Sequence, residues 1–191
     1  FTRGAIQHTA VLPIAGDQIT NDIAMTLRTP TREAEDLKIA HGIALRQLAD
    51  AREMIEVPGI GERGARMLSK QLLSEVIEPR VEELYSLVQA ELRRSGFEEQ
   101  ISSGIVLTGG TSQMKGMVEL AEEVFHVPVR VGVPEYVGGL SERVRSPAYA
   151  TGVGLLMAGL EKHELDEAAK IEAASFGQVM ERMKSWFKNT F

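Results

Sequence analysis

The sequence predicts an α/β fold, on two observations. Segments with the apolar period of a helix alternate with short apolar segments typical of strands, and the chain of 191 residues is long enough for a sizeable core. The net charge of −6 argues against nucleic acid as the main partner, because phosphate binding favours a basic surface. Without cysteine, disulfides and thiolate metal sites are excluded, and the 4 histidines lack the spacing of a metal site.

The first third of the chain predicts one strand and two helices. Ala5 to Ile14 is expected to be a strand. Asp17 is expected to cap a helix, whose apolar side chains recur at helical spacing at Ile19, Ile23 and Leu27. A second helix is expected to begin at Thr29-Pro30, with the threonine as its cap, and to end near Gly42.

The middle of the chain predicts a short strand and then the longest helix. Glu53 to Val57 is expected to be the strand, closed by the turn at Pro58-Gly59. The helix follows from the spacing of Leu73, Ile77, Leu84, Val88 and Leu92. Pro79 lies inside it and is expected to kink or split it, because proline lacks a backbone donor.

The last folded part predicts two strands and two helices. Gly104 to Thr108 and Val127 to Val133 are expected to be strands, on either side of an amphipathic helix from Ser112 to Phe125. Pro147 to Leu160 is expected to be a buried helix rich in small residues.

The C-terminal part changes composition twice. Residues 161–174 carry five acids and two bases, which predicts a flexible or weakly helical linker. In residues 175–191, a helix would place its large apolar side chains within an arc of roughly 140°. Its bases lie on or beside the other face, which favours binding to an anionic lipid surface over docking on the protein's own core, the alternative. One such helix binds weakly, so lasting attachment is expected to need several chains.

Two local patterns suit a nucleotide. The strand from Gly104 runs into Gly109 and Gly110 before a helix, an arrangement that offers backbone amides to an anion, although it also fits a simple tight turn. Glu35 and Lys38 are neighbours on one helix face and offer an acceptor and a donor to a ribose or an adenine edge, but also fit a solvated charged face.

Taken in order, six segments and the basic aromatic C-terminus resemble the C-terminal half of the actin-like FtsA family of bacterial cell-division proteins. The segments are His8-Thr9, Ile19 to Ala24, Ala34 to Lys38, Ile77 to Arg80, Gly104 to Gly110, and Ala150 to Leu155. The resemblance implies an actin/Hsp70-like nucleotide-binding domain. Its ribonuclease-H-type lobe would comprise residues 1–28 and 97–160, and its small subdomain residues 29–96. Residues 161–174 would be the linker and 175–191 the membrane-targeting helix.

The same resemblance implies an ATP site. Glu35 and Lys38 would hold the ribose and adenine, Gly109, Gly110 and Thr111 would line the other side, and Met114 would lie near the base. The phosphate-binding hairpins and the Mg²⁺ ligands are expected to precede Phe1, in a part of the protein that this chain lacks. We therefore expect no ATP hydrolysis by this chain alone, and at most weak ATPase activity in the full-length protein.

The family tethers the tubulin-like division protein FtsZ to the cytoplasmic face of the inner membrane at the division site. By resemblance, Arg80 with Glu83 and Lys70 would bind the C-terminal peptide of FtsZ. The membrane-binding residues would be Val179, Met180, Arg182, Met183, Lys184, Trp186, Phe187, Lys188 and Phe191. Self-association into filaments and contacts with other division proteins are also implied.

Two alternatives of the same superfamily are a kinase and a cell-shape filament protein. A kinase would have no use for a detached basic aromatic helix, and filament proteins of that kind tend to carry their membrane element elsewhere.

Overall fold

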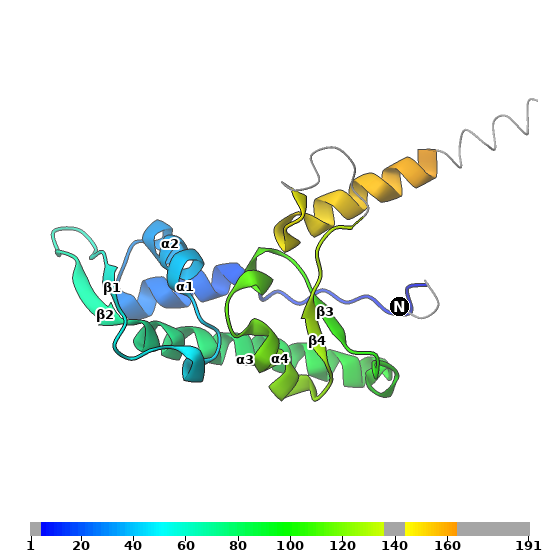
Figure 1. Cartoon of the computed structure of the whole chain (residues 1–191), viewed down its shortest axis with the longest axis horizontal. Coiled ribbons are helices and arrows are strands. Elements are labelled where there is room, and N and C mark those ends of the chain that lie inside the picture. Colours follow the sequence, from blue (N-terminus) through cyan, green and yellow to red (C-terminus); the bar gives the residue numbers. More distant parts are fainter. Residues whose placement is uncertain (1–4, 136–143, 164–191) are drawn as a thin grey trace, which may run out of the picture.

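The computed structural model describes residues 5–135 and 144–163, so residues 164–174 of the predicted linker and the predicted helix at 175–191 lie outside the described residues. Helices and short strands alternate along the chain, as an α/β fold requires (Figure 1). The helices are α1 (Gly16–Leu27), α2 (Thr31–His41), α3 (Lys70–Ser95) and α4 (Met117–Phe125), the short 3₁₀ turns are η1 (Arg46–Leu48), η2 (Glu98–Gln100), η3 (Gly110–Gln113) and η4 (Pro147–Tyr149), and residues 150–163 are also helical.

The strands form two separate pairs. In the first, β1 (Met54–Val57) runs antiparallel to β2 (Arg66–Ser69), with Met54 opposite Ser69. In the second, β3 (Ile105–Leu107) and β4 (Val129–Val131) are parallel, and the chain between them carries α4, the usual crossover for parallel strands. The sequence did not predict β2, because its four residues show no clear alternation of apolar and polar side chains.

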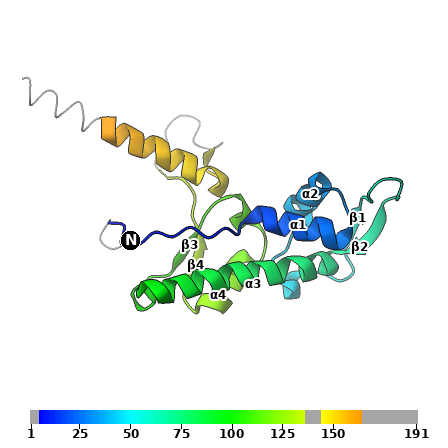
Figure 2. The same cartoon turned by 180° about the vertical axis from the view of Figure 1, so that it is seen from behind.

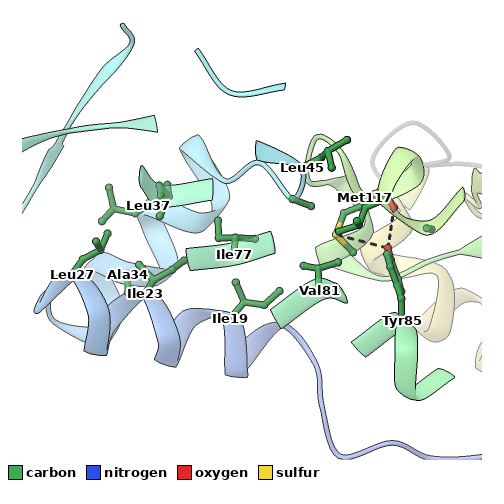
Figure 3. Close-up of a cluster of buried hydrophobic side chains, with 14 of the residues drawn as sticks. Ile19, Ile23, Leu27, Ala34, Leu37, Leu45, Ile77, Val81, Tyr85 and Met117 are labelled. Carbon is green, nitrogen blue, oxygen red and sulfur yellow. Dashed lines mark hydrogen bonds between the residues drawn. The ribbon is translucent and has the colours of Figure 1, made fainter. Parts of the chain in front are cut away.

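The main core lies where α1, α2 and α3 meet. Ile19, Ile23, Ile77 and Val81 are at most 1% exposed and point toward one another there (Figure 3). Burying one such side chain stabilises the fold by about 1.5–3 kcal/mol. The core continues to α4 through Tyr85, whose hydroxyl donates to the Met117 carbonyl over 3.0 Å.

Both predicted helix caps in the first third are wrong by one or two residues. The extended residue before α1 is Ala15, and its N–H donates to the Gln18 side chain over 2.8 Å, so Asp17 lies in the first turn instead. The second helix begins at Thr31 with Pro30 as its cap residue, because the backbone of Pro30 is still extended. Its predicted end near Gly42 is confirmed.

Pro79 does not split the long helix, which runs without a break over 26 residues. Proline removes the one hydrogen bond that its N–H would have made to the Glu75 carbonyl. The buried side chains of Leu73, Ile77 and Val81 on both sides of Pro79 hold the helix in the core despite that loss.

Three further predictions are wrong. Residues 6–14 contain no strand, and Val11 among them is 94% exposed, because no strand of the described part pairs with this segment. The predicted helix from Ser112 begins only at Met117, after the η3 turn and Gly116, whose φ is +89°. Residues 150–163 are helical but not buried, with Leu155 70% and Leu156 71% exposed (Figure 2), because no described element covers that face.

No helix among the described residues is both long enough and apolar enough to cross a membrane.

Candidate functional site

The first turn of α1, the middle of α2 and the η3 turn surround a cavity of about 480 Å³. Five of the six residues that the sequence analysis assigned to the nucleotide line it, namely Glu35, Lys38, Gly110, Thr111 and Met114. The sixth, Gly109, does not line the cavity but precedes the η3 turn with a φ of +94°. The two local patterns therefore meet in space, although their roles remain predictions.

Lys38 is the most connected polar group of this cavity. Its side chain is only 8% exposed, and its Nζ donates to the Gly16 carbonyl over 3.0 Å and to the Thr20 Oγ1 over 2.8 Å. A third bond of 2.6 Å joins the Lys38 Nζ to the Glu35 Oε2. A buried ammonium needs such partners, so the position of Lys38 is fixed by α1 as well as by its own helix.

Glu35 is the acceptor at the edge of the cavity, with its side chain 40% exposed. Burial raises the pKa of Glu35, but the hydrogen bonds from Lys38 and Thr20 and the charge of Lys38 outweigh it, so the pKa lies below its ordinary value. The carboxylate is therefore ionised at neutral pH and can accept a hydrogen bond from a hydroxyl group of a ligand.

Gly16 brings the two walls of the cavity close together. A Cβ at this position would lie 2.5 Å from the Thr111 Oγ1, closer than any ordinary contact, so only glycine fits here without displacing Thr111. Ile39 and Met114 add apolar surface to the same cavity. Apolar walls beside the Glu35 acceptor suit a ligand with a flat ring and hydroxyl groups.

The η3 turn is held from both ends. The Gly109 N–H donates to the Pro147 carbonyl over 3.0 Å, and the Ser112 hydroxyl donates to the Gly109 carbonyl over 2.8 Å. The Gln113 amide donates to the Gly110 carbonyl over 3.3 Å, and its Oε1 accepts from the Ser146 hydroxyl over 3.2 Å. The turn therefore keeps its shape before any ligand enters.

Gly16, Asp17, Ile39 and Gln113 also line the cavity but were not predicted. For Gly16, one sequence feature could have indicated a place in the site. It lies at the start of a predicted helix, and helix N-termini attract anions.

A second cavity of about 380 Å³ lies between α1 and α3 and contains Arg80 and Glu83. Arg80 binds Asp22 of α1 through two bonds, Nε to Oδ2 over 2.5 Å and Nη2 to Oδ1 over 3.1 Å, and its Nη1 donates to the Glu83 Oε2 over 2.5 Å. Hydrogen bonding to Asp22, together with the charges of Asp22 and Glu83, raises the pKa of Arg80. Met25, Val76 and Pro79 supply apolar surface beside these charges.

Lys70, the third residue predicted for a partner site, does not line this cavity. It lies at the first residue of α3 and forms an ion pair with Glu53. Asp22 was not predicted, because it lies 58 residues before Arg80 in the sequence and no local pattern links the two.

The described residues contain no group of three or more histidine, aspartate or glutamate side chains placed to hold a metal ion.

Comparisons with known proteins agree on the family. The family model described as "Cell division protein FtsA" matches residues 1–154. Cell division protein FtsA of Pseudomonas aeruginosa is 58% identical over 197 residues, which cover 100% of this chain and 47% of the relative. The protein of that name from Escherichia coli K12 is 42% identical over 201 residues, which cover 100% of this chain and 48% of the relative. The chain thus spans about half the length of these curated relatives.

Two solved structures share the fold. MreB 5 of Spiroplasma citri bound to AMPPNP has a TM-score of 0.64 at 17% identity, over 85% of this chain and 49% of that chain. The ADP-bound form of the same protein has a TM-score of 0.53 at 18% identity, over 63% of this chain and 40% of that chain. The predicted α/β, actin-like fold is confirmed by this likeness.

Proposed function

Since this chain belongs to the FtsA family of cell-division proteins, we propose that it is the C-terminal half of an actin-like scaffold that binds ATP and tethers FtsZ to the membrane. The observation that carries the proposal is the cavity where Glu35 and Lys38 meet Gly110 and Thr111. The relatives are cell-division proteins, which favours this function over a kinase or a cell-shape filament protein.

The cavity is proposed to hold the adenosine end of ATP. The Glu35 carboxylate would accept a hydrogen bond from a ribose hydroxyl. Lys38 would donate to the ligand by exchanging one of its three bonds to Gly16, Thr20 and Glu35. Gly109, Gly110 and Thr111 would lie along the other side. Met114 would pack near the base. Mg²⁺ would enter with the phosphates, held by groups outside this chain. A scaffold needs occupancy rather than turnover, so we propose that hydrolysis is weak at most.

The experiment for this site compares two substitutions of Gly110 in a chimaera, in which this chain replaces the matched region of the Pseudomonas aeruginosa relative. A Cβ at Gly110 would meet nothing nearer than the Ala148 Cβ at 4.0 Å, so both Gly110→Ala and Gly110→Asp should fold. Asp at Gly110 would add a negative charge beside a polyanionic ligand, and a carboxylate as near as about 4 Å to a phosphate charge would cost about 1 kcal/mol, which is roughly fivefold in affinity. Titration with a fluorescent ATP analogue should show that loss for Gly110→Asp alone, and equal affinity of all three proteins would exclude this cavity.

Arg80 and Glu83, with Lys70 nearby, are proposed to bind the C-terminal peptide of FtsZ. Asp22 and Glu83 use three of the five guanidinium N–H groups of Arg80, so two remain for a carboxylate of the peptide. Met25 and Val76 beside it offer apolar contact. A short peptide that presents one carboxylate to Arg80 and an apolar side chain to this surface fits such a combination, whereas Asp22, Glu75 and Glu83 in the same lining disfavour further acids.

Residues 175–191, which lie outside the described residues, are proposed to form the amphipathic helix that lies on the cytoplasmic membrane surface. The aromatic side chains of Trp186 and Phe187 would enter the headgroup boundary, and Lys184 and Lys188 would face anionic lipid. Because one such helix binds weakly, filaments of several chains would give lasting attachment at the division site, where other division proteins assemble.

A further inference from the structure

One helix contributes to both cavities. Gly16 and Asp17, in the first turn of α1, line the proposed nucleotide cavity, and Asp22 and Met25, farther along the same helix, line the proposed peptide cavity. We propose that α1 couples the two cavities, so that nucleotide in the first increases the affinity of the second for its peptide, with Asp22 as the positioning residue. This inference rests on the proposed function of the two cavities.

At the nucleotide end, two side chains of α2, Lys38 and Glu35, bind the start of α1. The Lys38 Nζ donates both to the Gly16 carbonyl and to the Thr20 hydroxyl, over 3.0 Å and 2.8 Å. The same ammonium binds Glu35 at the edge of the cavity. A ligand that engages Glu35 and Lys38 therefore acts on the bonds that place this turn.

At the peptide end, α1 decides where the Arg80 guanidinium lies. Asp22 is two residues beyond Thr20, so it projects from roughly the opposite side of the helix, about 200° away. Its two oxygens take two bonds from Arg80, a bidentate arrangement that fixes both position and orientation. A shift or a stiffening of α1 therefore reaches Arg80 directly.

The part of α1 between the two ends is packed too tightly to absorb such a change. Ile19 and Ile23 are 1% and 0% exposed and point at Ile77 of α3, the helix that carries Arg80 (Figure 3). Close-packed interiors transmit displacement instead of damping it. With 12 residues and no proline or internal glycine, α1 moves as one body.

The coupling is expected to be positive because bound nucleotide would reduce the motion of α1. Ligand contacts with Gly16 and Asp17 restrict the first turn of α1, and with it Asp22 and Arg80, before the peptide arrives. The protein then loses less conformational entropy when the peptide binds, so the peptide binds more tightly. Linkage requires the reverse effect as well, in which the peptide increases nucleotide affinity by the same factor.

The test measures binding of a labelled FtsZ C-terminal peptide to the chimaera, by fluorescence anisotropy, with and without saturating AMPPNP. We expect the dissociation constant to fall about fivefold or more, and the peptide to lower the dissociation constant of AMPPNP equally. For each ligand, we compare the dissociation constant without the other ligand with the constant in its presence. Asp22→Asn should bring both of these ratios close to one. The matched control is Asp36→Asn, which makes the same charge change on an exposed residue outside both cavities and should keep the ratios.

Hydrogen exchange separates the coupling from the peptide site itself. Without any peptide, AMPPNP should slow exchange of the amides at 22–27 and 75–83 as well as those of the first turn of α1. Protection confined to the first turn, ratios of one in the unmodified protein, or unchanged ratios in Asp22→Asn would each overturn the proposal. Absence of peptide binding in both states would count against the peptide site alone, and the exchange data would still decide the coupling.

Discussion

Gly16→Ala should destabilise the protein, although alanine is the better helix former. A Cβ at Gly16 would lie 2.5 Å from the Thr111 Oγ1 and 3.4 Å from the Lys38 Nζ. Thr111 must therefore retreat by about 0.9 Å to reach an ordinary contact of 3.4 Å. Forcing extra volume into a packed site costs about 1–3 kcal/mol, whereas alanine gains at most about 1 kcal/mol over glycine within a helix.

The expected net loss is about 1–2 kcal/mol in the free energy of unfolding, measured by urea denaturation with an unchanged slope. Thr111→Ala removes the atom that clashes, so the double variant Gly16→Ala/Thr111→Ala should recover most of the loss. Gly110→Ala is the matched control, because its Cβ would meet only the Ala148 Cβ, at an ordinary contact distance of 4.0 Å, and should leave the stability nearly unchanged. A stable Gly16→Ala protein, or no recovery in the double variant, would refute the close approach of α1 to η3.

Three further predictions concern charge and the C-terminus. Arg80→Glu places a third acid beside Asp22 and Glu83. It should weaken binding of the FtsZ C-terminal peptide roughly thirtyfold, which corresponds to the ~2 kcal/mol of an interface hot spot. Unaltered affinity by titration would remove Arg80 from that site. Replacing Trp186 and Phe187 together with glutamate should abolish co-sedimentation with anionic vesicles, whereas unchanged sedimentation would mean that this segment does not bind lipid. Hydrogen bonds from Arg94 and His8 lower the pKa of Glu91 from 4.5 to about 2, so its contribution to stability is present above pH 4.5 and is lost as the pH falls toward 2. Arg94→Gln should move the pKa of Glu91 back up in a carboxyl NMR titration, and an unmoved value would contradict the pairing.

The helices were predictable because their signal is local. The apolar spacing of Ile19, Ile23 and Leu27 reappears as the buried face of α1, and Leu73 and Ile77 as that of α3. Helix ends were less predictable, because they depend on single backbone conformations. The positive φ of Gly116, the residue before α4, delays the start of that helix to Met117, and nothing in its neighbours indicates that.

Burial depends on what lies beside an element, which periodicity does not contain. Residues 150–160 have the apolar composition of a buried helix, yet Leu155, Leu156 and Leu160 are each at least 65% exposed. The same limit applies to residues 6–14, part of the strand predicted from Ala5 to Ile14, because a strand also needs a neighbour to pair with. Composition therefore predicted the helix at residues 150–163 but not its exposure, and it did not predict that residues 6–14 lack a strand to pair with.

The candidate site shows the same division between local and distant information. Glu35 with Lys38 and Gly109 with Gly110 are visible as short patterns, and family resemblance was needed to bring the two patterns to one ligand. By spacing alone, Arg80 and Glu83 form an ordinary pair one helical turn apart. The decisive partner of Arg80 is Asp22, 58 residues away, which takes two of its bonds. A charge pair that spans two helices constrains their relative position, whereas a pair within one helix does not. Asp22, which local spacing could not reveal, therefore joins the cavity of Arg80 to α1, the helix that Lys38 binds at its other end.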